Sequence, residues 1–154
     1  MTKIEWEIKP FDRLCIDELY DLLKLRVDVF VVEQNCAYAE LDEKDRHPDT
    51  LHLTGRNENR ELVAYLRLLP PGLSFEQPGI GRVVVSEKNR GQGLCRTLIQ
   101  TAVDQIHRSW PGMGIKISAQ AYLEAFYQSY GFKKVSGPYS EDGILHLEML
   151  LGNF

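Results

Sequence analysis

Seven short stretches of the chain carry the pattern of hydrophobic and polar residues that is typical of strands. In some of them apolar and polar residues alternate, which predicts a strand with one buried face. In others the apolar residues run together, which predicts a strand in the interior of a sheet. The polar turn at residues 57–60 predicts a hairpin, and Asp142-Gly143 predicts a tight turn before the last stretch. The predicted strands are residues 4–8, 51–56, 62–69, 80–85, 115–119, 132–135 and 144–150.

Three further segments place apolar residues three and four positions apart, which is the spacing of one helix face. Asp17 is the predicted cap of the first helix, and Gly131 is placed to end the third. Arg26 is the one charged residue on the apolar stripe of the first helix, so we expect it to have a buried anionic partner. The predicted helices are residues 17–31, 94–109 and 122–130.

The order of these elements is strand, helix, three strands, helix, strand, helix and two strands. Because strands and helices do not alternate regularly, this order predicts a mixed sheet with helices packed on it. No repeat and no linker divides the chain. The two long polar loops, residues 35–50 and 70–79, are either solvated surface or functional loops.

Composition narrows the class of protein. The chain has 154 residues, of which 44% are hydrophobic and 26% charged, so fibrous and disordered classes are excluded. A net charge of −4 argues against a nucleic-acid partner but allows a local basic pocket. The longest apolar run is residues 62–66, so no membrane span is expected, and the N-terminus lacks the apolar core of a signal peptide. Three widely spaced cysteines fit reduced thiols and a cytoplasmic location.

The sharpest local feature is a glycine-rich turn between a predicted strand and a predicted helix. Backbone N–H groups at a helix start lack partners and carry partial positive charge, so they suit a phosphate. Two glycines allow close approach, and two arginines add charge. A tight connection that binds nothing is the alternative, and the P-loop and dinucleotide patterns do not fit. The candidate binding residues are Val83, Val84, Val85, Arg90, Gly91, Gln92, Gly93, Leu94, Cys95 and Arg96.

A second feature is the aromatic segment at residues 126–132. Core packing is the ordinary role of such side chains. A tyrosine hydroxyl at the mouth of a cleft can also donate a proton, so Tyr127 and Tyr130 are candidates for that chemistry.

Taken together, these two motifs resemble those of a known protein family. Residues 90–95, after the strand that ends at 83–85, resemble the acyl-CoA loop of the GNAT superfamily of N-acetyltransferases, and residues 126–132 resemble its second signature. Residues 25–34 and 141–146 look like its ElaA-like branch. The resemblance implies a single α/β (α+β) domain over residues 1–154. It also implies a mixed, mostly antiparallel sheet of six to seven strands flanked by helices.

The resemblance also implies a reaction, the direct transfer of an acetyl group from acetyl-CoA to a primary amine. The loop amides would bind the pyrophosphate, and the backbone of Val83 and Val85 would pair with the pantetheine arm. A backbone N–H near Val85 would face the thioester oxygen, and Tyr127 would protonate the departing thiolate. The chain departs from the family pattern at Cys95, which replaces the usual Gly or Ala and tightens the approach to the pyrophosphate. It also departs at Gln120 and Leu123, which affects contacts to the pantetheine.

The attacking amine must lose a proton, and the strand before the loop carries Arg82 rather than a carboxylate. Glu33, His52 and His146 are therefore the candidate bases. Arg26 and Arg82 are further candidates on the substrate side, for pairing with an acid or a substrate carboxylate.

In the resembling fold, the first helix and the loop at 35–50 border the amine pocket, where Asp42 and Asp45 could attract a cationic amine. The four histidines lack the spacing of metal ligands, so no metal is expected. Cys95 at a helix start could be an oxidisable thiol.

Two functions remain open from the sequence. One is an acetyl-CoA-dependent N-acetyltransferase that acts on a small-molecule or peptide amine as a monomer or homodimer. The other is a non-catalytic acyl-CoA-binding or interaction module on the same scaffold.

Overall fold

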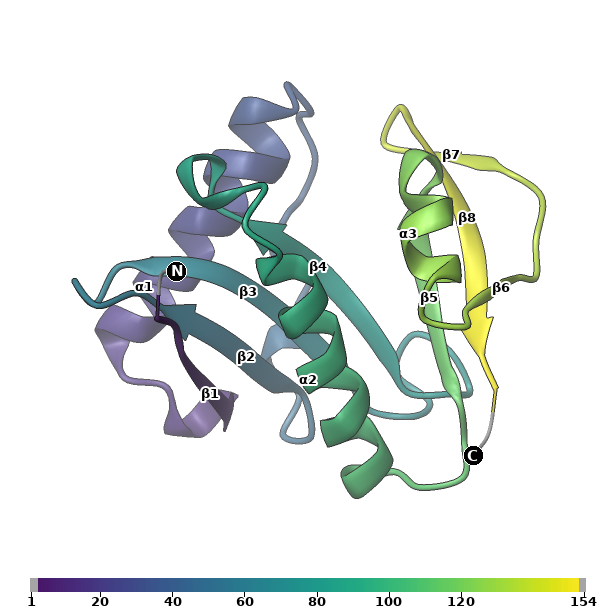
Figure 1. Cartoon of the computed structure of the whole chain (residues 1–154), viewed down its shortest axis with the longest axis horizontal. Coiled ribbons are helices and arrows are strands. Elements are labelled where there is room, and N and C mark those ends of the chain that lie inside the picture. The colour runs from purple at the N-terminus through teal and green to yellow at the C-terminus, as the bar shows by residue number, and fades with distance from the viewer. Residues whose placement is uncertain (1–2, 153–154) are drawn as a thin grey trace.

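A computed structural model describes residues 3–152 and contains one continuous sheet with eight strands in that range. The strands follow the order β1-β2-β3-β4-β5-β8-β6, and β7 pairs with β8 (Figure 1). Every pairing is antiparallel except that of β4 with β5. The strands are β1 (Glu5–Pro10), β2 (Leu51–Arg56), β3 (Leu62–Leu69), β4 (Gly79–Val85), β5 (Ile115–Gln120), β6 (Lys133–Lys134), β7 (Tyr139–Glu141) and β8 (Ile144–Leu151).

The parallel strands β4 and β5 meet at one end and then diverge. Gly79 is the residue of β4 that stays in register with β5, opposite Lys116. A Cβ atom at Gly79 would lie only 3.0 Å from the carbonyl oxygen of Lys116, so a glycine permits this close approach. Beyond it the two ribbons splay apart as a wedge (Figure 1). The diverging half of β4 therefore has an edge that β5 does not pair.

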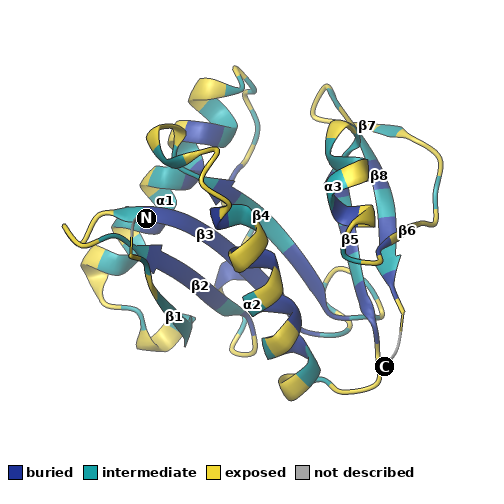
Figure 2. Ribbon diagram, in the orientation of Figure 1, coloured by how far each residue is buried: buried dark blue, intermediate teal, exposed yellow. Residues whose placement is uncertain are grey.

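Helices cover both faces of the sheet. The main core forms where α2 (Leu94–Ser109) and α3 (Glu124–Gln128) pack on one face. The other face is covered by α1 (Ile16–Arg26), which continues as a π-helical segment, η2 (Val27–Glu33), over Tyr65 and Val84. The central strands β2 and β3 are consequently buried along most of their length (Figure 2). Short 3-10 turns lie at Phe11–Arg13, Lys44–Arg46, Glu87–Asn89 and Ala121–Leu123.

Local hydrogen bonding moves some element bounds away from those predicted. The first helix begins at Ile16 and not after Asp17, because the Cys15 Sγ accepts the Glu18 N–H at 3.4 Å while Glu18 accepts the Cys15 N–H at 3.0 Å. This reciprocal pair is a capping box, with a thiol in the place of the usual hydroxyl.

The C-terminal region also differs in detail. The predicted strand at 132–135 is reduced to β6, and the predicted third helix divides into a 3-10 turn and α3. The sequence pattern missed β7, because its three residues carry no apolar alternation and are strand only through pairing with β8. The predicted turn at Asp142-Gly143 joins these two strands, with φ of 51° and 79°. Within residues 3–152, no helix has the length and apolar character that crossing a membrane requires.

Candidate active site

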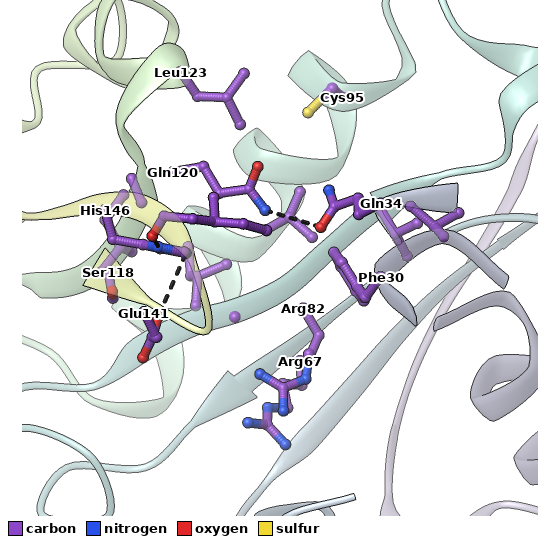
Figure 3. Close-up of a pocket in the computed structure, with 18 of the residues that line it drawn as sticks. Phe30, Gln34, Arg67, Arg82, Cys95, Ser118, Gln120, Leu123, Glu141 and His146 are labelled. Carbon is purple, nitrogen blue, oxygen red and sulfur yellow. Dashed lines mark hydrogen bonds and ion pairs between the residues drawn. The ribbon is translucent and has the colours of Figure 1, made fainter. Parts of the chain in front are cut away.

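A cleft of about 940 Å³ occupies the wedge between β4 and β5. Its walls come from the glycine-rich loop, α3, the π-helical segment and the β7–β8 hairpin. Figure 3 shows side chains from these elements converging on one space, with Cys95 and Leu123 at one end and Arg67 and Arg82 at the other. The cleft therefore has a loop end and an arginine end.

The loop end is built from the glycine-rich turn. Gly91 and Gly93 have φ of 77° and 78°, a region that favours glycine, and a Cβ at either position would meet no atom within 4 Å. Gly93 is the N-cap of α2 and has no side chain to accept a hydrogen bond. The first N–H groups of the helix therefore have no acceptor from their cap. Of the ten residues predicted here, nine line the cleft, and Gln92 instead borders a separate hollow beside Trp6.

Two arginines frame this loop. Arg90 donates from both terminal nitrogens to the carboxylate of Glu33, at 2.6 and 2.9 Å, and from Nε to the Val85 carbonyl at 3.0 Å. These bonds hold the pKa of Glu33 below its usual value. The guanidinium of Arg96 lies over the rings of Phe126 and Tyr130, 5.7 and 5.6 Å from their centroids. Glu33, a candidate base in the sequence, is thus engaged with the loop.

Tyr127 projects from α3 into the same cleft. It is 5% exposed and makes edge-to-face contacts with Phe126 and Phe132. Burial raises the pKa of its phenol, so the group keeps its proton at neutral pH. Among the described residues nothing accepts or donates a hydrogen bond at this hydroxyl. The Tyr130 hydroxyl, by contrast, donates to the Arg96 carbonyl at 2.7 Å.

Cys95 lines the cleft next to Tyr127 at the start of α2. Burial raises the pKa of its thiol and outweighs the lowering effect of Arg96. This direction is opposite to the one that its position at a helix start suggests, because burial disfavours the thiolate more than the nearby charge favours it.

Beneath the arginine end lies a cluster of three arginines and three acids. Arg26 is fully buried and donates to Asp45 at 2.7 Å and to Glu40, which confirms the expected buried anionic partner. Arg67 reaches Asp42 at 2.7 and 2.9 Å and Asp45 at 3.1 Å. The cluster is completed by Arg82, whose Nε lies 2.8 Å from Glu40.

Ion pairing sets the protonation of these acids. Desolvation alone would raise the pKa of Asp42 and Asp45, but hydrogen bonds and charges from the arginines outweigh it and hold both well below their usual range. The two aspartates nevertheless differ in position. Asp42 is 26% exposed and lines the cleft, whereas Asp45 is buried and lies outside the lining. Of the two aspartates, Asp42 alone faces the cleft.

His52 and Arg26, both predicted on the substrate side, belong to this buried layer and do not line the cleft. The ring nitrogens of His52 lie 2.7 Å from the Tyr65 hydroxyl and 3.1 Å from the Asp45 carbonyl. A carbonyl only accepts, so Nε2 carries the proton and Nδ1 accepts from Tyr65. Desolvation lowers the pKa of His52, which keeps it neutral.

The remaining candidates, Arg82 and His146, do reach the cleft, from opposite sides (Figure 3). His146 lies beside Tyr139 and Glu141, two residues that no motif in the sequence marks for chemistry. A signal for them was present, because a two-residue turn at 142–143 sets Glu141 opposite Ile144 and Tyr139 opposite His146.

Gln34 and Gln120 extend toward each other across the cleft, at 3.5 Å between their amide groups (Figure 3). Cys36 donates to the carbonyl of Asp142 at 3.1 Å, between segments 106 residues apart in sequence. These two contacts join the segment after η2 to the arm formed by β5 and the β7–β8 hairpin. The loop predicted to border an amine pocket thus contributes Cys36, Tyr38 and Asp42 to the lining.

Comparison with known proteins agrees with this architecture. Residues 23–152 match a family model described as an acetyltransferase (GNAT) domain. Protein ElaA of Escherichia coli is 43% identical over 146 residues, which cover 95% of each chain. Its crystal structure aligns with a TM-score of 0.91 at 42% identity, over 97% of this chain and 99% of that one. An acyl-CoA N-acyltransferase from Pseudomonas aeruginosa aligns with a TM-score of 0.93 at 44% identity, over 97% and 100% of the two chains. The chain therefore belongs to the GNAT acetyltransferase domain family, among relatives of ElaA.

Proposed function

We propose that this protein transfers an acetyl group from acetyl-CoA to a primary amine by direct attack. The observation that carries the proposal is the combination of an uncapped helix start, a half-unpaired β4 edge and a buried tyrosine hydroxyl along one cleft. These three features fit the pyrophosphate, the pantetheine arm and the thioester of an acyl-CoA, in that order along the cleft.

The binding part of the proposal rests on shape and polarity. The open space at Gly91 and Gly93 leaves room for a pyrophosphate against the N–H groups of Gly91 to Arg96. The amides of the pantetheine arm can pair with the free edge of β4 at Val83 and Val85, as an added strand would. Arg90 and Arg96 add positive charge near the phosphates.

The chemical part follows from the same placement. The amine nitrogen attacks the thioester carbon, and a backbone N–H near Val85 stabilises the negative charge that develops on the thioester oxygen. The carbon–sulfur bond then breaks, and the departing thiolate takes the phenolic proton of Tyr127. The nitrogen gives up its surplus proton, the Tyr127 phenolate regains one, and the products are an N-acetyl amide and free CoA.

The acceptor enters from the arginine end. Phe30, Tyr38 and Asp42 line this side, and the carboxylate of Asp42 stays ionised there. We expect a small-molecule or peptide amine to approach the thioester along this side, where the Asp42 carboxylate is already paired with Arg67.

The decisive experiment measures CoA release from acetyl-CoA against a panel of primary amines, with a parallel calorimetric titration of CoA. We expect CoA to bind and at least one amine to release it with formation of the acetylated product. Binding of CoA without turnover on any amine would assign the protein to the non-catalytic acyl-CoA-binding class. Absence of binding would overturn the proposal altogether.

A further inference from the structure

The direct-attack reaction requires a group that removes a proton from the amine. A lysine-like amine has a pKa of about 10.4 in water, so at neutral pH it is almost entirely the unreactive ammonium ion. The general base must therefore reach the cleft and hold a lone pair that no other protein group occupies.

Most candidates in the described part of the chain fail this requirement. Both carboxylate oxygens of Glu33 accept from Arg90, and both oxygens of Asp42 accept from Arg67. The pKa of each carboxyl lies below its usual range, which makes each a weak base. His52 is enclosed, and both of its ring nitrogens are engaged.

We propose that His146 is the general base of the transfer and that Glu141 is its positioning residue. This inference rests on the proposed function and assigns a step that it leaves open. His146 lies on β8, with a side chain that is 12% exposed and borders the cleft. It is thus accessible to a substrate while largely shielded from bulk water.

The tautomer of His146 follows from its backbone contact. Its Nδ1 lies 2.8 Å from the carbonyl oxygen of Ile144. Because a carbonyl only accepts hydrogen bonds, Nδ1 must carry the proton of the neutral ring. Nε2 then holds the lone pair, which is the form that a general base requires.

Glu141 is placed to respond when that lone pair takes a proton. Its Oε2 lies 3.4 Å from His146 Nε2, from the opposite strand of the hairpin (Figure 3). A carboxylate has no attraction for the lone pair of a neutral imidazole, but it forms an ion pair with the imidazolium. The interaction therefore strengthens as the proton arrives, which is what catalysis by differential binding demands.

The side chain that stacks on the ring from β7 and the one paired with it on β5 carry no charge at neutral pH. The Tyr139 ring stacks on His146 at 6.2 Å between centroids and 27° between planes, and its hydroxyl pairs with Ser118 of β5. Gln120 of β5 lies opposite in register. These contacts fix the plane of the imidazole, so Nε2 keeps its direction.

The proton inventory of the step closes. Nε2 takes one proton from the ammonium group, and the freed nitrogen lone pair forms the bond to the acyl carbon. The carbon–sulfur bond breaks, and the thiolate takes the proton of Tyr127. Once bonded to the acyl carbon, the nitrogen loses its second surplus proton, which restores the Tyr127 phenolate to the phenol. The imidazolium returns its proton to solvent, so the reaction releases one proton overall.

The test compares two acceptors of the same shape and different basicity. One is the best primary alkylamine from the panel, and the other is its O-alkyl hydroxylamine analogue, which is mostly unprotonated at neutral pH. For His146→Gln we expect kcat/KM to fall about 10²–10⁴-fold with the alkylamine, and by less than about tenfold with the analogue, because only the first acceptor must lose a proton before it can attack. Glu141→Gln should show the same dependence on acceptor with a smaller loss.

The controls separate this inference from the function on which it rests. His47→Gln and Glu148→Gln alter a histidine and a glutamate outside the cleft, and both should keep the wild-type ratio between the two acceptors. Calorimetric affinity for CoA should be unchanged in all four variants. If wild type turns over and His146→Gln loses equal activity with both acceptors, or none with either, the assignment is wrong while the function stands. If wild type releases no CoA, the function itself has failed.

Discussion

The hydroxyl of Tyr127 is the residue-scale feature on which the proposed chemistry depends most. Its ring is packed between Phe126 and Phe132, and its hydroxyl is left without a hydrogen-bond partner among residues 3–152. Tyr130, three residues later, uses its hydroxyl to hold the start of α2. Two tyrosines that look equivalent in sequence thus have different tasks, and replacing each by phenylalanine compares them directly.

For Tyr127→Phe we expect a fall in kcat of about 10²–10⁴-fold, because the ring and its packing stay while the proton donor is lost. This corresponds to about 3–5 kcal/mol in the activation free energy. Steady-state kinetics and CoA calorimetry should show the loss in kcat at constant CoA affinity. Tyr130→Phe serves as the control with near-normal turnover. A Tyr127→Phe enzyme within about twofold of wild type would leave only a packing role for this side chain.

At the scale of elements, the junction of β4 with α2 depends on glycines for two separate reasons. Gly93 needs its left-handed backbone, and it also leaves open the space next to the helix start. Gly112, in the turn after α2, has the same φ to within 1° and the same open surroundings, but it lies outside the cleft. The chain therefore contains its own control for backbone strain.

Gly93→Val and Gly112→Val should each lose stability by about 1–3 kcal/mol, since valine is strained at positive φ. Only Gly93→Val should lose CoA affinity, because only there does the new side chain occupy the space proposed for the pyrophosphate. Denaturation curves and CoA titration of the two folded variants measure these effects separately. Undiminished affinity in a folded Gly93→Val protein would mean that the phosphates bind elsewhere.

On the scale of the whole molecule, the buried ionic cluster joins α1, the loop at 35–50 and the central strands. Asp45 takes part in two of its ion pairs, with Arg26 and Arg67, and its backbone carbonyl accepts from His52. Removing one partner from such a network leaves a buried charge without compensation, which costs more than the pair itself contributes.

Asp45→Asn should therefore lower the free energy of unfolding by about 3–5 kcal/mol. Asp49→Asn, in the same loop but exposed and without an ion pair in the described structure, should change it by less than about 0.5 kcal/mol. Urea denaturation at neutral pH compares the two. If the two variants are equally stable, groups other than Asp45 neutralise the buried arginines of the cluster.

The same cluster predicts how stability depends on pH. His52 is buried in its neutral form, and burial lowers its pKa. Its contribution to the free energy of unfolding is therefore complete above its unfolded pKa of 6.5 and is lost as the pH falls below that value. The pKa values of Asp42 and Asp45 are also lowered on folding. Their contribution to stability is therefore complete above the unfolded value of 3.8 and is lost as the pH falls below it. The free energy of unfolding, measured from pH 8 to 3, should thus fall in two phases.

Two variants assign these phases. His52→Gln should flatten the upper phase, and Asp45→Asn should weaken the lower one. The lower phase should not vanish, because Glu18 contributes there as well. Desolvation alone would raise the pKa of Glu18, but its hydrogen bonds to Cys15 and Lys9 outweigh that effect and lower the pKa to about 2. A single phase in wild type that neither variant alters would contradict the assignment of the two pKa shifts.

The sequence by itself determined the local features of this protein, namely its individual strands, helices and turns. The alternating strands, the apolar helix faces, the glycine-rich turn and the Asp142-Gly143 turn all follow from residues near one another in the chain, and the structure confirms them. The family follows from the same short motifs and their spacing. The sequence also predicted that Arg26 has a buried acidic partner, because an arginine on an apolar helix face requires an acid.

Only the tertiary structure decided which residues meet. The partners of Arg26 lie 14 and 19 residues away, and Arg90 is held by Glu33 from 57 residues away. Of the three candidate bases, Glu33 and His146 line the cleft where β4 and β5 diverge, while Phe11, Tyr65 and the turn at Asp45 enclose His52. These outcomes depend on where strands and helices cross in space, a property of the packed sheet that no local pattern in the chain contains.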